Sequence, residues 1–90
     1  LVVGGKNSAA IASLELYRAG ASVTLVHRGQ TLSDRIKYWI RPDIENRIKE
    51  GSVIAYFQAC VTEIRPTSAL VRLASDDVRE VPADAVLLLT

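Results

Sequence analysis

The sequence predicts an α/β fold, with a central parallel sheet, helices packed on it and a small antiparallel meander. Three observations carry this prediction. Apolar runs of strand length recur along the chain, and segments with helical spacing of apolar residues separate the first of them. Residues 85–89 are apolar at every position, which is typical of a parallel strand covered on both faces. The chain has 90 residues, 49% of them apolar and 23% charged, as in one globular domain.

The first three predicted elements are a strand, a helix and a second strand. Residues 1–3 are apolar and run into two glycines, which indicates a strand entering a tight turn. Residues 7–19 have apolar positions at three-and-four spacing, and Gly20 is placed to end this helix in a left-handed conformation. Residues 22–27 are the second strand, so a strand–helix–strand unit is complete by this point.

The segment between residues 31 and 51 is predicted to be helical in two pieces. Pro42 lacks an amide proton and disfavours helix at the residue before it, but it fits the first turn of a new helix. Gly51 is the predicted end of this second piece. Residues 52–57 then form the third strand.

Three short alternating segments follow, at residues 60–64, 69–73 and 79–82, and they predict an antiparallel meander. The apolar run described above is the last strand. This order of elements predicts a doubly wound, Rossmann-like domain with three layers. In such sheets the ligand lies at the carboxyl ends of the strands, so we expect the site near residues 4–9 and 27–28.

Charge and hydropathy exclude two classes of partner. Eleven basic and ten acidic residues give a net charge of +1, so the whole chain has no general attraction for nucleic acid. No apolar run approaches the ~18 residues that a membrane helix needs. The segment 27–41 is locally basic; its charged residues are Arg28, Asp34, Arg35, Lys37 and Arg41. For Arg35 and Arg41, a solvated helix face explains the charge equally well.

Cys60 is the single cysteine of the chain. One thiol excludes an internal disulfide, a CxxC redox pair and a cysteine-cluster metal site, and we predict no metal site and no catalytic residue. We interpret Cys60 as a small packing residue of a strand rather than a nucleophile. Its isolation favours a reducing, cytoplasmic compartment.

The glycine turn after the first strand resembles an incomplete dinucleotide fingerprint. Such a fingerprint needs a glycine for the tight turn, a second where the backbone meets the pyrophosphate, and a small residue for helix packing. Gly4, Lys6 and Ala9 occupy these places. A lysine side chain can obstruct a phosphate or attract one, and Gly5 can take the unusual backbone angles in its place. The polar residues at 7–8 can cap a helix whose free amides suit an anion.

The end of the second strand indicates which dinucleotide would bind. A site for NAD places an acidic residue here for the ribose hydroxyls, whereas a site for NADP needs cations for the 2′-phosphate. His27 and Arg28 stand at this end, without an acid. An arginine can form two hydrogen bonds to a phosphate, so the sequence favours NADP over NAD. The alternative is that His27 only ends a strand and Arg28 is a solvated loop residue.

Four segments together resemble a known family: VVGGKNSA, VTLVHRG, IKYWIRPDIENRIKEG and ADAVLLLT. They are similar to the NADPH-binding domain of the flavin-dependent pyridine nucleotide-disulfide oxidoreductases, and within it to the thioredoxin-reductase-like bacillithiol-disulfide reductases. The resemblance implies a pyrophosphate-binding turn, a 2′-phosphate site and a further basic residue. The matching positions are, in that order, Gly4, Gly5, Lys6, Asn7, Ser8 and Ala9; His27 and Arg28; and Lys37. It departs at Gly29 and Ser33, where typical thioredoxin reductases have arginines.

The resemblance also implies that residues 1–90 are one NAD(P)-binding domain from a larger flavoprotein, in which the domain lies between two halves of an FAD domain. The FAD fingerprint and the CxxC motif are absent from this chain. We therefore expect a module that binds NADP(H) but does not turn over alone. Its partner would be the FAD domain of the longer protein, where hydride passes from NADPH to FAD for reduction of a disulfide or related acceptor.

Two alternatives remain at this point. One is a non-catalytic NAD(P)-binding regulatory or sensor module, which the same turn would serve. The other is a methyltransferase-like fold, although its ribose site usually has an acid where His27 stands. The sequence leaves the electron acceptor and the oligomeric state open, a homo-oligomer included.

Overall fold

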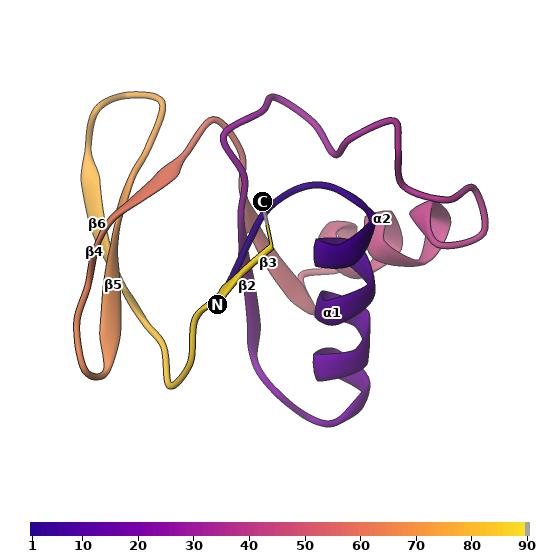
Figure 1. The fold of residues 1–90 in the computed structure, drawn as a ribbon, viewed down its shortest axis with the longest axis horizontal. Helices are drawn as coiled ribbons and strands as arrows, with labels where there is room; N and C mark the ends of the chain where they lie inside the picture. The colour runs from indigo at the N-terminus through magenta and orange to yellow at the C-terminus, as the bar shows by residue number, and fades with distance from the viewer. Residues whose placement is uncertain (90) are drawn as a thin grey trace.

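A computed structural model describes residues 1–89 as three layers, and so confirms the predicted fold class (Figure 1). A four-stranded parallel sheet lies in the middle, both helices pack on one of its faces, and a three-stranded antiparallel sheet covers the other. The helices are α1 (Asn7–Arg18) and α2 (Arg41–Lys49). The strands are β1 (Val2–Val3), β2 (Val23–Val26), β3 (Val53–Tyr56), β4 (Cys60–Ile64), β5 (Ser68–Arg72), β6 (Val78–Pro82) and β7 (Leu87–Leu88). Neither helix in this part of the chain is long and apolar enough to cross a membrane.

The central sheet has the strand order β3-β2-β1-β7, and all three pairings are parallel. The chain moves outward from β1 to β3 and then returns to the other side of β1 with β7. The strand order therefore reverses beside β1, at the place where open α/β sheets bind ligands beyond the strand ends. The carboxyl ends of β1 and β2 are Val3 and Val26, which are direct partners in the register.

Helix α1 packs on the sheet through its small residues. Ala9 and Ala10 are almost completely buried, and Leu14 joins them in a core cluster with Val2 and Leu25 of the sheet. Alanines at these positions let the helix axis approach the strands closely. The helix ends as predicted, because Gly20 has a φ of +93° that an L side chain rarely adopts.

The first of the two predicted helical pieces, residues 31–40, is wrong: this segment forms bends and turns. Leu32 and Ile36 are buried at a spacing of four, which mimics a helix in the sequence. However, two backbone amides of the segment bond elsewhere: Ser33 N donates to Gly5 O at 2.8 Å, and Lys37 N donates to the Asn7 side chain. Tertiary hydrogen bonds thus replace the helical ones.

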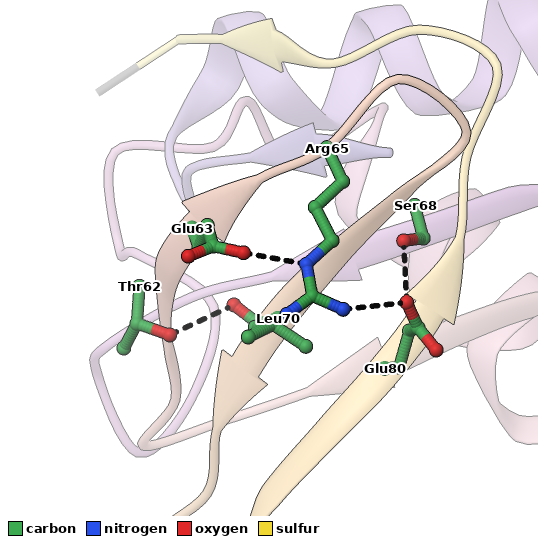
Figure 2. Close-up of polar contacts among 6 residues, drawn as sticks. All are labelled: Thr62, Glu63, Arg65, Ser68, Leu70 and Glu80. Atoms are coloured by element: carbon green, nitrogen blue, oxygen red, sulfur yellow. Dashed lines mark hydrogen bonds and ion pairs between the residues drawn. The ribbon is translucent and has the colours of Figure 1, made fainter.

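The meander packs on the central sheet through a second cluster, formed by Val26, Ala59, Val71 and Val81. Strand β4 contains a register shift between Val61 and Glu63. Figure 2 shows a polar network on this sheet. The Arg65 guanidinium donates hydrogen bonds to Glu63 and Glu80, and the Ser68 hydroxyl donates to Glu80 at 2.8 Å. The Ser68 hydrogen bond and then Arg65 lower the pKa of the Glu80 carboxyl.

Strand β7 is parallel, as predicted, and pairs with β1, but the prediction that both of its faces are covered is wrong. Leu87 is 39% exposed and Leu88 is 64% exposed. The strand is two residues long and lies at the edge of the sheet. A fully apolar run therefore indicated the parallel pairing correctly and the burial incorrectly.

Candidate functional site

A cavity of about 580 Å³ opens at the carboxyl ends of β1, β2 and β7, between the central sheet and the meander. Its size is within the range of small-molecule sites. One end carries the basic residues, and the other is mostly apolar, with Thr62 and Glu63 among its lining residues. The lining residues are Val3, Gly4, Gly5, Lys6, Val26, His27, Arg28, Ala59, Cys60, Val61, Thr62, Glu63, Ile64 and Leu88. Five of the residues predicted for the site thus share one cavity.

Gly4 is the residue of the turn that requires glycine for its backbone. Its φ is +144°, and a Cβ there would lie 2.6 Å from the carbonyl oxygen of Leu89. The expectation that Gly5 takes the unusual angles is therefore wrong, because Gly4 has them. Lys6 has an extended backbone with φ −100°, which a lysine adopts without strain. Its side chain is exposed, so it does not fill the turn.

The imidazole of His27 lies between two glycines. A Cβ at Gly5 would lie 2.4 Å from the His27 ring carbons, and a Cβ at Gly29 would lie 2.6 Å from Nε2. The ring edge also contacts Phe57 in a T-shaped arrangement with centroids 6.4 Å apart. His27 therefore points toward the glycine turn, and Gly29 is the residue that makes room for it.

The electrostatics of the polar end favour an anion. Burial lowers the pKa of the His27 imidazole below its ordinary value of 6.5, the neighbouring Arg28 charge lowers it further, and the Thr31 backbone raises it. The neutral form of His27 therefore predominates at pH 7, and it can donate or accept a hydrogen bond. Arg28 and Lys6 are exposed cations on the same cavity. The first amides of α1 have no partner within the helix and add a positive dipole end.

The other predicted site residues lie beside the cavity rather than on its wall. Ala9 is completely buried under the turn, Ser8 is exposed, and Lys37 is exposed with its ammonium 5.9 Å from the Trp39 ring centre. The prediction that residue 7 or residue 8 caps α1 is wrong. The N-cap is Lys6, and it makes no side-chain cap hydrogen bond. The Asn7 Oδ1 instead accepts the Lys37 backbone N–H at 3.1 Å.

The wall opposite the turn could not be predicted from the sequence patterns. Strand β4 supplies most of it, including Val61 and Ile64, and β7 adds Leu88. Cys60 also lies on this wall and is exposed, so its interpretation as a packing residue is wrong. Only the tight connection from β3 to β4 could have suggested this placement, because it brings residues 60–64 back to the end of β2.

The layers and the cavity at the strand ends define a Rossmann-like α/β domain of the kind that binds nucleotides. The family model of pyridine nucleotide-disulphide oxidoreductases matches residues 1–90. The chain therefore belongs to that family, whose members use nicotinamide and flavin cofactors.

Three relatives illustrate this membership. The chain is 37% identical to Bacilliredoxin reductase Bdr of Bacillus subtilis over its whole length, which is 28% of that protein. The Bacillithiol Disulfide Reductase Bdr from Bacillus cereus superposes with a TM-score of 0.95 at 36% identity, over 99% of this chain and 27% of that one. Thioredoxin reductase from Lactococcus lactis gives a TM-score of 0.80 at 25% identity, over 99% and 30%. The chain thus spans between a quarter and a third of the length of these proteins.

Proposed function

We propose that this chain is the NADPH-binding domain of a flavin-dependent oxidoreductase, which passes hydride from NADPH to FAD for reduction of a disulfide or related acceptor. One observation carries the proposal: the glycine turn, His27 and Arg28 line a single cavity at the carboxyl ends of the parallel strands. The relatives support the reaction class, because one is named a bacilliredoxin reductase and the other a bacillithiol disulfide reductase. The short span relative to them supports a flavin site elsewhere in a longer protein.

The residues at the polar end fit the phosphates of a dinucleotide. Gly4 and Gly5 keep the turn narrow, so that a pyrophosphate can reach the first amides of α1. Arg28 would bind the 2′-phosphate through two charge-assisted hydrogen bonds, and neutral His27 would add one. NADPH, when bound, supplies the hydride, and the task of this chain is to hold the cofactor in a fixed orientation. Cys60 is a free, exposed thiol, which fits the reducing cytoplasm that we infer for the protein.

The proposal is tested by calorimetric titration of the chain with NADPH and with NADH. We expect tighter binding of NADPH, and the Arg28→Ala variant should weaken it by about tenfold, since one charge-assisted contact to phosphate is lost. Binding of NADH should change by less than about twofold. Arg79→Ala is the matched control, because Arg79 is exposed on β6 and does not line the cavity. A preference for NADH, or no binding of either cofactor, would contradict the proposal.

The electron-transfer part of the proposal concerns the longer protein. There, NADPH should bleach the absorbance of bound FAD, and Arg28→Ala should raise the NADPH concentration needed for this. The chain alone should bind NADPH without oxidising it. A longer protein that carries no flavin would instead indicate the regulatory or sensor module.

A further inference from the structure

We propose that Asn7 determines the preference for NADPH over NADH by fixing the basic loop, residues 28–40, against the glycine turn. The inference rests on the proposed function and deepens it, because it assigns a positioning role to a residue that does not line the cavity. Asn7 is the first residue of α1, one position after the N-cap Lys6. Its side-chain oxygen accepts a hydrogen bond from outside the helix.

The Asn7 side chain makes a hydrogen bond across thirty residues of sequence. Its Oδ1 accepts the backbone N–H of Lys37 at 3.1 Å. Two further bonds hold the same loop: Ser33 N donates to Gly5 O at 2.8 Å, and the Arg41 guanidinium donates to Ser33 O. The loop has no regular secondary structure before α2, so these bonds, together with the burial of Leu32 and Ile36 in the core, determine where it lies. The bonds attach it to the glycine turn, to the first residue of α1 and to the start of α2.

The attachment of the loop to the glycine turn also restricts where the positive charges of the loop lie. Lys37 and Arg35 are exposed on the loop, and no ion pair holds either of them within residues 1–89. The Lys37 backbone is bonded to the first residue of α1, and the same loop begins at Arg28, where the 2′-phosphate is proposed to lie. NADPH carries this phosphate and NADH lacks it. The cations that the attached loop keeps on this side of the glycine turn therefore favour NADPH, and a loosened loop loses part of this selectivity.

The Asn7→Ala variant isolates this role. Alanine is a good helix residue and leaves every backbone amide of the turn in place, so binding of the shared pyrophosphate should be retained. The bond from Ser33 to Gly5 also remains, so the loop is loosened rather than released. We expect the ratio of NADH to NADPH dissociation constants to fall about three- to fivefold, the range for partly exposed charge interactions. Asn46→Ala, on the exposed side of α2, is the matched control and should leave the ratio unchanged.

A double-mutant cycle shows whether Asn7 acts through Lys37. Lys37→Ala should lower the same ratio, and the combination Asn7→Ala with Lys37→Ala should lower it no further than Lys37→Ala alone. Additive losses in the double variant would overturn the proposal. An equal loss of NADH and NADPH affinity in Asn7→Ala would also overturn it, because Asn7 would then bind the shared part of the cofactors or support the fold. An unchanged ratio in Asn7→Ala would overturn it as well.

Hydrogen exchange provides a readout that does not depend on the cofactor. The Lys37 amide should exchange slowly in the unliganded chain and faster in Asn7→Ala, while the Ser33 amide keeps its protection. Equal exchange of the Lys37 amide in both proteins would show that the attachment is absent. If the unmodified chain binds neither dinucleotide, both the proposed function and the role of Asn7 are contradicted. If the unmodified chain prefers NADPH and only the double-mutant cycle disagrees, the role of Asn7 alone is contradicted.

Discussion

His27 owes its place to two residues without side chains. The ring fits between Gly5 and Gly29, at separations that a Cβ on either glycine would make impossible. The sequence identified His27 and Arg28 from their position at the end of the second strand, because strand ends can be located from hydropathy. The resemblance describes Gly29 only as the place of a missing arginine, whereas in the structure its lack of a side chain makes room for the His27 ring. A contact between residues 5, 27 and 29 depends on the turn geometry, which no spacing rule provides.

The pKa of His27 leads to a prediction about pH. His27 is the only histidine, so its ring protons can be followed by NMR without ambiguity. We expect a pKa below 6.5 in the folded chain, and a partial rise toward 6.5 in Arg28→Gln, since burial is the larger cause and remains. The unfolded chain then binds the proton more readily than the folded one. The contribution of His27 to stability is therefore complete above pH 6.5 and is lost as the pH falls from there through the folded pKa.

Unfolding experiments test the same lowering of the His27 pKa. Denaturant midpoints should fall between pH 7 and pH 5.5 in the unmodified chain, and this fall should be smaller in His27→Asn. A folded pKa at or above 6.5 would contradict the assignment, because it would mean that the ring is solvated or faces an acidic group.

At the scale of elements, sequence patterns located all seven strands to within two residues, and both observed helices. They failed where tertiary contacts overrode a local pattern. Leu32 and Ile36 have helical spacing, yet the loop that contains them is held by bonds to the glycine turn. For the seventh strand, β7, hydropathy predicted burial where the strand is an exposed edge. Hydropathy indicates a preference for burial, but the elements packed next to a strand determine whether its side chains are buried.

Helix α2 depends on a single buried side chain, and this leads to a prediction about stability. Ile44 is the only buried residue of the helix and is completely inaccessible. Ile44→Ala should lower the free energy of unfolding by about 2–5 kcal/mol, because it leaves a cavity in the main core cluster. Ile54→Ala is the matched control, since Ile54 is 52% exposed on β3, and should cost less than about 1 kcal/mol. Equal losses in the two variants would show that α2 is not anchored in this way.

At the scale of the whole molecule, the packing of the two sheets is the reason why only half of the cavity could be predicted from the sequence. Its polar half comes from segments that begin and end strands of the central sheet, and a general rule for α/β sheets places ligands there. Its apolar half exists because the meander packs on the sheet through Val26 and Val71. The predicted elements did not include the packing of one sheet on the other, so the wall formed by residues 59–64 could not be expected.

The two halves of the cavity should contribute differently to binding, and this is testable with one substitution on the apolar wall. Ile64 is 55% exposed on that wall, so Ile64→Ser should leave the fold intact. It is expected to weaken NADPH and NADH by the same factor, about fivefold for a partly covered apolar side chain, because the wall contacts only what the two cofactors share. Ile54→Ser, similarly exposed on β3 and away from this cavity, should change neither dissociation constant. Arg28→Ala affects the ratio of the two constants, whereas Ile64→Ser should affect only their magnitude. A change in that ratio caused by Ile64→Ser would mean that the 2′-phosphate lies against the meander, so that the orientation of the dinucleotide in the cavity is the reverse of the one proposed.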